Sequence, residues 1–226
     1  MSSKPETYQA ITAAYVAPFA AFVGIMAVEK VFSISPQWAY PVRFFAVSAM
    51  VLTVARHYWT ERPSRPFASL CLGAAVFIIW IGPDVLFDYR HSWLFNNALT
   101  GASTSSIPVE LRTHFWFVLI RTFSCTALVP IVEELFWRGW LMRWLIDQNF
   151  MSVPLGKYTP AAFWLVAILF ASEHGPYWDV GLITGVIYNW WMVRTRNLGD
   201  CILMHAVTNG ILSAYVVVTG RWEYLS

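Results

Sequence analysis

The chain has 226 residues, of which 58% are hydrophobic and only 12% are charged. A soluble domain usually carries about 25% charged and about 45–50% apolar residues, so this composition excludes an ordinary soluble globular protein. The net charge is +2, and the basic residues are dispersed between apolar runs, which excludes a nucleic-acid-binding surface. Thirteen tryptophans suit a surface that faces lipid. We therefore predict a multi-pass integral membrane protein whose first partner is the lipid bilayer.

Apolar stretches follow one another along the chain with no internal repeat. A helix needs about 20 apolar residues to cross a bilayer, and the pattern predicts an all-α transmembrane bundle of about seven spans, within about one either way. The predicted spans lie at 8–28, within 31–55, and at 67–81, 112–146, 160–172, 178–193 and 198–219. The stretch 82–111 mixes Pro, Asp, Asn, Ser and Gly with aromatic residues and is predicted to be a loop outside the membrane. No cleavage site follows the first apolar run, so it is predicted to be a retained anchor.

The chain is predicted to form one structural domain in which the two parts differ in content. Residues 1–110 supply transmembrane helices and a loop without a motif, and residues 111–226 form the motif-bearing core. The three cysteines, Cys71, Cys125 and Cys201, form no CxxC pair and have no spacing suited to zinc. They are interpreted as small buried hydrophobic residues.

Loop charges predict the orientation, because cytoplasmic loops carry an excess of Lys and Arg. With a cytoplasmic N-terminus, the inside loops hold Arg56, Arg62, Arg65, Arg143, Lys157, Arg194 and Arg196, whereas the outside loops and the C-terminal tail hold Lys30, Arg90, Arg112 and Arg221. This bias favours that orientation. We predict a multi-pass protein of the plasma membrane with its N-terminus in the cytoplasm.

Three polar groups fall within or beside the predicted spans. They are Glu133, Glu134 and Arg138 in VPIVEELFWRGW, His174 in LFASEHG, and His205 with Asn209 in CILMHAVTNGI. A charge at the centre of a bilayer costs several kcal/mol, so residues of this kind are functional candidates. For each group alone the structural alternative is a polar hinge or a hydrogen bond between helices.

The two adjacent glutamates are predicted to have different partners. Glu134 and Arg138 are four residues apart on a helix, so they share a face and can form an ion pair. Glu133 points about 100° away, which leaves its carboxylate free for another partner.

The depths of these residues along their helices also match. If the segments on either side of the turn at 147–159 form an antiparallel hairpin, Glu133 and His174 both lie about 20 Å from its tip and can meet. The last helix starts from the same side, and His205 and Asn209 lie about 10 and about 16 Å along it on one face, so that a modest re-entry or tilt of this helix brings them level with Glu133. Four polar side chains, Glu133, His174, His205 and Asn209, on three helices at compatible depths predict a site rather than isolated helix contacts.

Such a set supports acyl hydrolysis without a covalent intermediate. A carboxylate beside a neutral imidazole can take a proton from water and make it a nucleophile. A second imidazole and a carboxamide can donate hydrogen bonds to the oxyanion that follows. Serine and cysteine routes fit less well, because Ser172 has no GxSxG-like setting and Cys125 has no histidine nearby in sequence.

Together the three motifs resemble the CPBP family of intramembrane proteases, which includes the eukaryotic CAAX prenyl endopeptidase and bacterial Abi-type proteins. The family pattern is EExxxR, then FxxxH, then HxxxN or HxxxB. Here it corresponds to residues 133–138, 170–174 and 205–209, in that order. The size and layout are similar to the bacterial branch associated with exosortase sorting systems.

The resemblance implies a glutamic-type intramembrane endopeptidase without a cofactor, acting on a membrane-anchored protein, as in the processing of CAAX-box proteins. It implies that Glu133 and His174 activate water and that His205 and Asn209 form the oxyanion hole. The family name does not by itself fix the substrate as a prenylated one.

The resemblance further implies that Glu134 and Arg138 support the site. Other functions can use the same residues. Zinc held by Glu133, His174 and His205 would make a metalloprotease, although the chain has no HExxH motif. A non-catalytic immunity factor, scaffold or receptor could be built on the same fold. A transporter could use Glu and His as proton relays, but no internal repeat supports this.

Overall fold

The computed structural model describes residues 7–225, and its regular structure is helical. The longer helices are α1 (Tyr8–Val31), α2 (Pro36–Thr53), α3 (Pro66–Phe87), α7 (Pro160–Ser172), α8 (Trp178–Thr195) and α9 (Leu198–Thr219). In the described part of the chain the β-structure is limited to one isolated bridge between Asn97 and Gly101. The predicted all-α class is confirmed.

A long central helix runs over Phe115–Trp144 and is not α-helical throughout. It consists of α4 (Phe115–Phe123), a π-helical turn (Ser124–Leu128), α5 (Val129–Glu134), a second π-helical segment (Leu135–Leu141) and α6 (Met142–Trp144). π-Helical turns are rare in proteins, and those that occur are frequently found at functional sites. Both of these flank the Glu133-Glu134 pair.

The helices begin where the sequence offers helix-start signals. Proline occupies the first turn of α2, α3 and α7, where the missing N–H costs nothing because that group has no partner inside the helix. The Thr159 side chain accepts a hydrogen bond from the Ala162 N–H and caps α7. The Asn197 side chain caps α9 in the same way through the Asp200 N–H.

The predicted number of about seven spans is not confirmed. Four helices are long and apolar enough to cross a membrane, namely Tyr8–Val31, Pro66–Phe87, Phe115–Trp144 and Leu198–Thr219. α7 is apolar but has only 13 residues, and α2 and α8 reach 18 residues without sufficient apolar character. The extramembrane loop predicted for 82–111 starts later than expected, because α3 continues to Phe87 and ends at Asp88 in a left-handed conformation.

The interpretation of the three cysteines as buried residues holds only in part. Cys201 is buried and Cys125 is partly buried, but Cys71 is exposed on α3. The interpretation is therefore wrong for Cys71, because an apolar sequence around a residue in a membrane helix does not distinguish the packed face of that helix from the face toward lipid.

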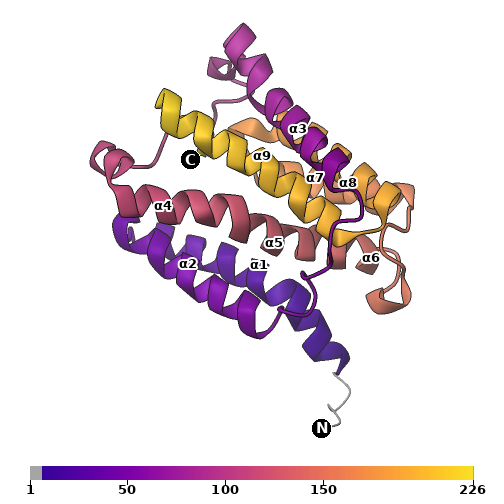
Figure 1. The fold of residues 1–226 in the computed structure, drawn as a ribbon. Coiled ribbons are helices and arrows are strands. Elements are labelled where there is room, and N and C mark those ends of the chain that lie inside the picture. The colour runs from indigo at the N-terminus through magenta and orange to yellow at the C-terminus, as the bar shows by residue number, and fades with distance from the viewer. Residues whose placement is uncertain (1–6, 226) are drawn as a thin grey trace.

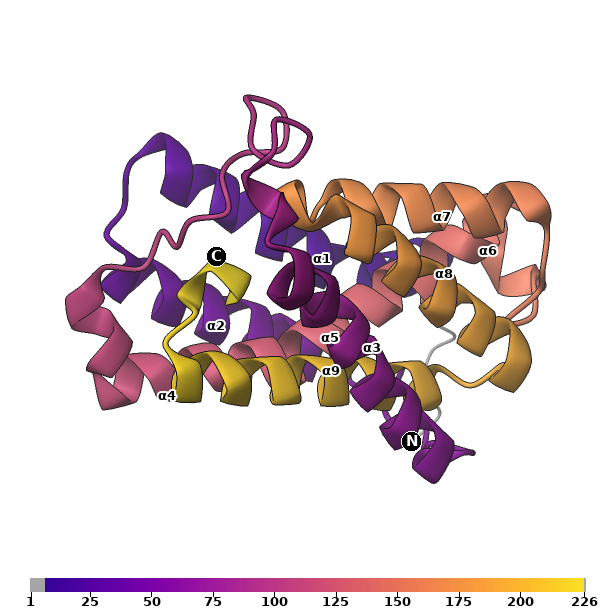
Figure 2. The ribbon, with the colours of Figure 1, turned by 90° about the horizontal axis from the view of Figure 1, so that it is seen from above.

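The helices form a bundle in which the central helix lies between two groups (Figures 1 and 2). On one side, α1 packs against it through Phe19, whose ring stacks on Phe136 at 4.0 Å between centroids. On the other side lie α3, α7, α8 and α9. α3 and α9 approach closely at Gly73, where an added Cβ would meet the Met204 carbonyl oxygen at 2.5 Å.

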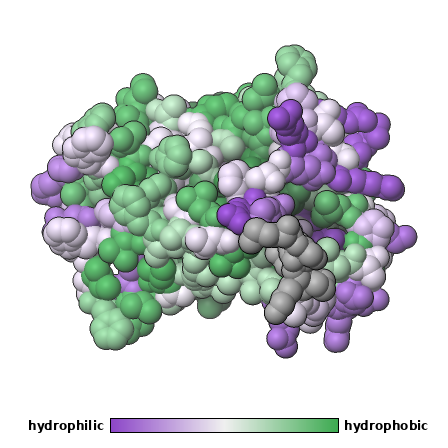
Figure 3. Space-filling model, turned by 60° about the horizontal axis from the view of Figure 1, so that its bottom comes forward, coloured by the Kyte–Doolittle hydropathy of each residue, from purple (hydrophilic) through white to green (hydrophobic). Residues whose placement is uncertain are grey.

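The predicted cytoplasmic loops gather at one end of the molecule. Buried Asp200 at the start of α9 accepts hydrogen bonds from the backbone N–H groups of Ser64 and Arg65, at 3.2 and 2.8 Å. Tyr8 donates a hydrogen bond to the carbonyl of Gln148, which places the start of α1 beside the 147–159 turn. Figure 3 shows hydrophilic side chains concentrated at one end of a largely apolar surface. The basic loops that set the predicted orientation therefore share one face.

We expect Gly73→Ala to destabilise the protein by about 1–3 kcal/mol, because the new methyl group cannot fit without moving α9. Gly24→Ala in α1 is the matched control, since beyond the local backbone of its own helix no atom lies within 4 Å of the place that its new methyl group would take, and alanine favours a helix. Thermal unfolding in detergent measures both variants. Equal unfolding temperatures for the two would contradict the close α3–α9 contact.

Candidate active site

A buried polar cluster joins the central helix to α8 and α9. Arg138 donates from Nη1 to Glu134 Oε1 at 3.1 Å and from Nε to Asn189 Oδ1 at 3.0 Å. The same Glu134 oxygen accepts a hydrogen bond from His205 Nδ1 at 2.9 Å. Asn189 donates in turn to the carbonyl of Phe163 in α7, at 2.8 Å. One carboxylate and one guanidinium thus connect four helical segments.

The predicted ion pair between Glu134 and Arg138 is present, and both side chains are completely buried. The Arg138 guanidinium also lies over the rings of Phe170 and Tyr188, at 4.7 and 5.2 Å from their centroids. Aromatic faces favour a cation, so these rings replace part of the hydration that burial removes. The contact between Glu134 and His205 was not predicted.

His174 lies just beyond the C-terminus of α7. Its Nδ1 donates to the carbonyl of Phe170 at 2.7 Å, and the two rings are 4.6 Å apart. The last carbonyls of a helix have no partner inside the helix, and the spacing of four residues lets the histidine occupy one of them. This bond fixes the tautomer, so that Nε2 carries a lone pair. The Phe–x–x–x–His spacing is therefore a means of orienting the imidazole.

The Asn209 side chain is held by a backbone carbonyl in the first π-helical turn of the central helix. Its Nδ2 donates to the carbonyl of Cys125 at 2.9 Å. In the π-helical turn the Val129 N–H bonds to the Ser124 carbonyl, so the next bond in that register would run from residue 130 to Cys125. Residue 130 is proline and has no N–H to give. Pro130 therefore leaves the Cys125 carbonyl available to α9, and one N–H of Asn209 remains for another acceptor.

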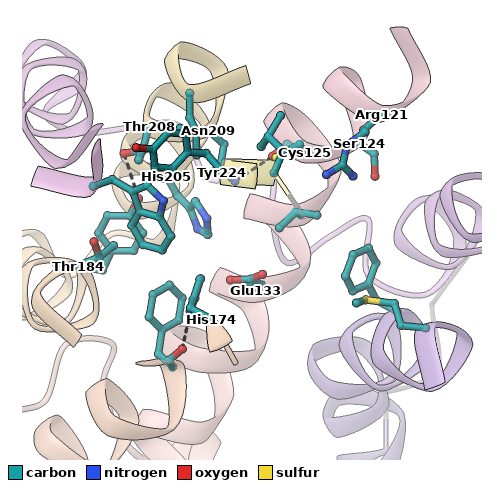
Figure 4. Close-up of a pocket in the computed structure, with 18 of the residues that line it drawn as sticks. Arg121, Ser124, Cys125, Glu133, His174, Thr184, His205, Thr208, Asn209 and Tyr224 are labelled. Atoms are coloured by element: carbon teal, nitrogen blue, oxygen red, sulfur yellow. Dashed lines mark hydrogen bonds between the residues drawn. The ribbon is translucent and has the colours of Figure 1, made fainter. Parts of the chain in front are cut away.

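Glu133, His174, His205 and Asn209 line one pocket of about 230 Å³. Figure 4 shows the Glu133 carboxylate facing the same space as the two imidazoles. Glu133 is half-buried, and its Oε2 is buried without a hydrogen-bond partner in the described part of the chain. The structure thus brings together all four residues that were predicted to share a site. The neighbouring Glu134 lies behind the pocket wall, where it holds Arg138 and His205.

The end of the chain covers part of this pocket. Tyr224 and Leu225, in the short helix Trp222–Leu225, line it beside Trp80 of α3. Tyr224 donates a hydrogen bond to Asp84 Oδ2 at 2.5 Å. Burial raises the pKa of the Tyr224 hydroxyl, and the hydrogen bond to the Asp84 carboxylate raises it further. The hydroxyl therefore stays protonated and keeps the segment in place.

Several residues of the site were not identified from the sequence. Asn189 and Tyr188 lie in α8, and of the two only Asn189, an amide within a predicted span, offered a signal. The centroid of the Tyr188 ring lies 5.0 Å from that of the His205 ring, with the two rings tilted, and the Tyr188 hydroxyl donates to Thr208 at 3.1 Å. Arg121 also lines the pocket. Among residues 7–225, no three His, Cys, Asp or Glu side chains converge in a way that could hold a metal ion.

Comparison with known families gives a match over residues 114–211, to the model described as type II CAAX prenyl endopeptidase Rce1-like. No curated protein and no solved structure matches the chain. The matched residues contain all three motifs, so the resemblance predicted from them is confirmed. Residues 114–211 form an Rce1-like domain of the CPBP family.

This family is one of CAAX-type proteases, which are hydrolases. Together with the apolar helices, the match indicates a membrane protease that works on a protein substrate at the bilayer.

The buried pair gives a stability prediction. We expect Glu134→Gln and Arg138→Gln each to destabilise the protein by about 3–5 kcal/mol, because each change leaves the other charge buried and unpaired. Thermal unfolding in detergent is the measurement. The double variant should be more stable than either single variant, since neither charge remains.

Glu110→Gln is the control for the change in charge, because Glu110 is exposed, and we expect an effect within about 0.5 kcal/mol. Single variants as stable as Glu110→Gln would show that the Glu134–Arg138 pair does not support the fold.

Proposed function

We propose that the protein is a glutamic-type intramembrane endopeptidase that hydrolyses a peptide bond of a membrane-anchored protein. One observation carries this proposal: Glu133, His174, His205 and Asn209, from three separate helical segments, line a single pocket. The family match over residues 114–211 supports a protease. The proposal needs no cofactor, and it assigns the reaction to water activated by side chains.

Glu133 and His174 are the proposed activators of water. A water molecule between them can donate one hydrogen to the lone pair on His174 Nε2 and lose the other proton to the Glu133 carboxylate. The resulting hydroxide attacks the carbonyl carbon of the scissile bond, and the carbonyl oxygen becomes an oxyanion. Glu133, now protonated, returns the proton to the departing nitrogen. One amide and one water thus give one carboxylic acid and one amine.

His205 and Asn209 are the proposed donors to the oxyanion. Asn209 has one N–H left after its bond to Cys125. His205 uses Nδ1 toward Glu134, so a donor at Nε2 requires a doubly protonated ring. The Glu134 carboxylate balances the charge of such a ring, which gives this buried glutamate a second purpose beside its pair with Arg138. Donors placed in advance stabilise charge that develops in the transition state.

We also propose the plasma membrane as the location, with the N-terminus in the cytoplasm. The loops rich in arginine and lysine lie at the end of the molecule where α1 begins, which is the arrangement that the charge bias of cytoplasmic loops favours.

We expect Glu133→Gln to abolish hydrolysis with little change in stability, because glutamine keeps the shape but cannot take a proton. The measurement is cleavage of one peptide substrate by purified protein, beside thermal unfolding. Glu110→Gln controls for a lost carboxylate on the surface. Full activity in Glu133→Gln would refute the assignment of the general base.

We expect a graded loss at the oxyanion donors. Asn209→Ala should lower the rate by about 10²–10³, because one donor is lost while water activation is intact. His174→Ala should be nearly as inactive as Glu133→Gln, since it removes the acceptor that orients the water. A zinc-dependent mechanism would give a different ranking of the variants by activity, because loss of any ligand removes the metal. Stoichiometric zinc in active protein, absent after changes at Glu133, His174 or His205, would replace the glutamic mechanism with a metal-dependent one.

A further inference from the structure

Arg121 is a pocket cation with no anionic partner among residues 7–225. It lies on α4 and lines the same pocket as Glu133, and Figure 4 shows it beside Ser124 at the end of the pocket away from His174. Its Nε is buried and has no hydrogen-bond partner in the described part of the chain. None of the ion pairs formed by residues 7–225 includes it. Its guanidinium carbon lies 4.8 Å from the centroid of the Tyr40 ring.

The neighbouring charges do not neutralise this arginine. Arg43 approaches the same Tyr40 ring at 4.7 Å and also lines the pocket. Its charge is matched by Glu29, whose Oε2 accepts from Arg43 Nη1 at 2.7 Å. The set of Arg43, Glu29 and Arg121 therefore carries one surplus positive charge inside a helical bundle. Arg121 is partly buried and its Nε is fully buried without a partner in the described part of the chain, so an anionic ligand at this point would gain a charge-assisted hydrogen bond.

A continuous wall leads from this arginine to the proposed catalytic glutamate. Arg121, Ser124, Cys125, Val129 and Glu133 all come from the central helix and all line the pocket. At about 1.5 Å per residue, the two ends of this wall are about 18 Å apart along the helix. An extended peptide spans about 3.3 Å per residue, so about four or five residues cover that distance, allowing for the reach of the arginine side chain.

We infer that Arg121 is a specificity residue that binds a carboxylate of the substrate peptide, about four or five residues from the bond that is cut. This inference rests on the proposed peptidase function of the pocket. A guanidinium matches a carboxylate in a two-pronged geometry, and the Tyr40 face holds it in position. The carboxylate can be the free end of the peptide or an Asp or Glu side chain. Arg121 is placed to select peptides by charge while Glu133 carries out the reaction.

The test measures binding separately from cleavage. Purified full-length protein is mixed with a defined pool of ten-residue apolar peptides, each made in four forms: free carboxylate end, amidated end, amidated with one internal Asp, and amidated with the matching Asn. Retained peptides and new cleavage products are both quantified by mass spectrometry. The proteins compared are wild type, Arg121→Gln, Arg121→Lys and Arg194→Gln. Arg194 is exposed on α8, so its variant loses the same charge outside the pocket.

We expect wild type and Arg194→Gln to retain carboxylate forms over their neutral counterparts by about 10- to 100-fold, the range for a hydrogen bond to a charged group. Arg121→Gln should lose this preference, and Arg121→Lys should recover part of it. Preference for the free end over internal Asp, or the reverse, identifies the source of the carboxylate. Cleavage products should show the cut about four or five residues from that group.

Two results would overturn the inference. The first is an equal retention of charged and neutral peptides by wild type, including no retention of either. The second is an unchanged preference for carboxylate peptides in Arg121→Gln, which would show that Arg121 does not bind the peptide carboxylate. A carboxylate preference that depends on Arg121, without any cleavage, would support this inference and count against the proposed peptidase.

Discussion

The arrangement of the pocket depends on a single buried carboxylate. Glu134 Oε1 receives both the Arg138 guanidinium and the His205 imidazole, and Arg138 extends the connection to Asn189 and so to α7 and α8. Removing charges from water costs several kcal/mol for each ion, so such a cluster is stable only when its members complete one another's hydrogen bonds. Because the participating groups lie on different helices, the helices have one relative placement in which that condition is met. Because Glu133 is next to Glu134 on the same helix, this constraint also fixes the position of Glu133 in the pocket.

The two adjacent glutamates, Glu133 and Glu134, lie in different environments. On a helix, neighbouring side chains point in directions about 100° apart, so one can face the packed interior while the other faces a cavity. Glu134 is fully buried and paired, and Glu133 is half-buried with an oxygen that lacks a partner within residues 7–225. The first environment gives rigidity, and the second gives a group that is able to react. Separating these tasks between adjacent residues avoids a conflict between stability and reactivity at one carboxylate.

Much of the fold and of the candidate site could be predicted from the sequence, and the features that could not be predicted have physical reasons. Helix positions, the Glu134–Arg138 pair and the common location of Glu133 and His174 follow from helical spacing and rise, which are local properties. The bond between His205 and Glu134 depends on how far α9 is rotated against the central helix, and the sequence contains no direct record of that angle. The π-helical turns alter the angular spacing within one helix, so the face on which Arg121 lies could not be read from a regular period. The number of about seven spans is not confirmed, because α2, α7 and α8 are helices that fall short in length or apolar character.

Pro130 contributes to the pocket because it has no backbone N–H. The Cys125 carbonyl therefore has no donor in that register of the central helix and accepts a hydrogen bond from Asn209 instead, which attaches the central helix to α9. Any other amino acid at this position would supply a competing donor within the same helix. On the side of the central helix this attachment is made by a backbone atom, so it does not depend on which side chain residue 125 carries. Position 125 lines the pocket and can therefore vary, so one framework can be adapted to substrates of different shape while Asn209 keeps its anchor.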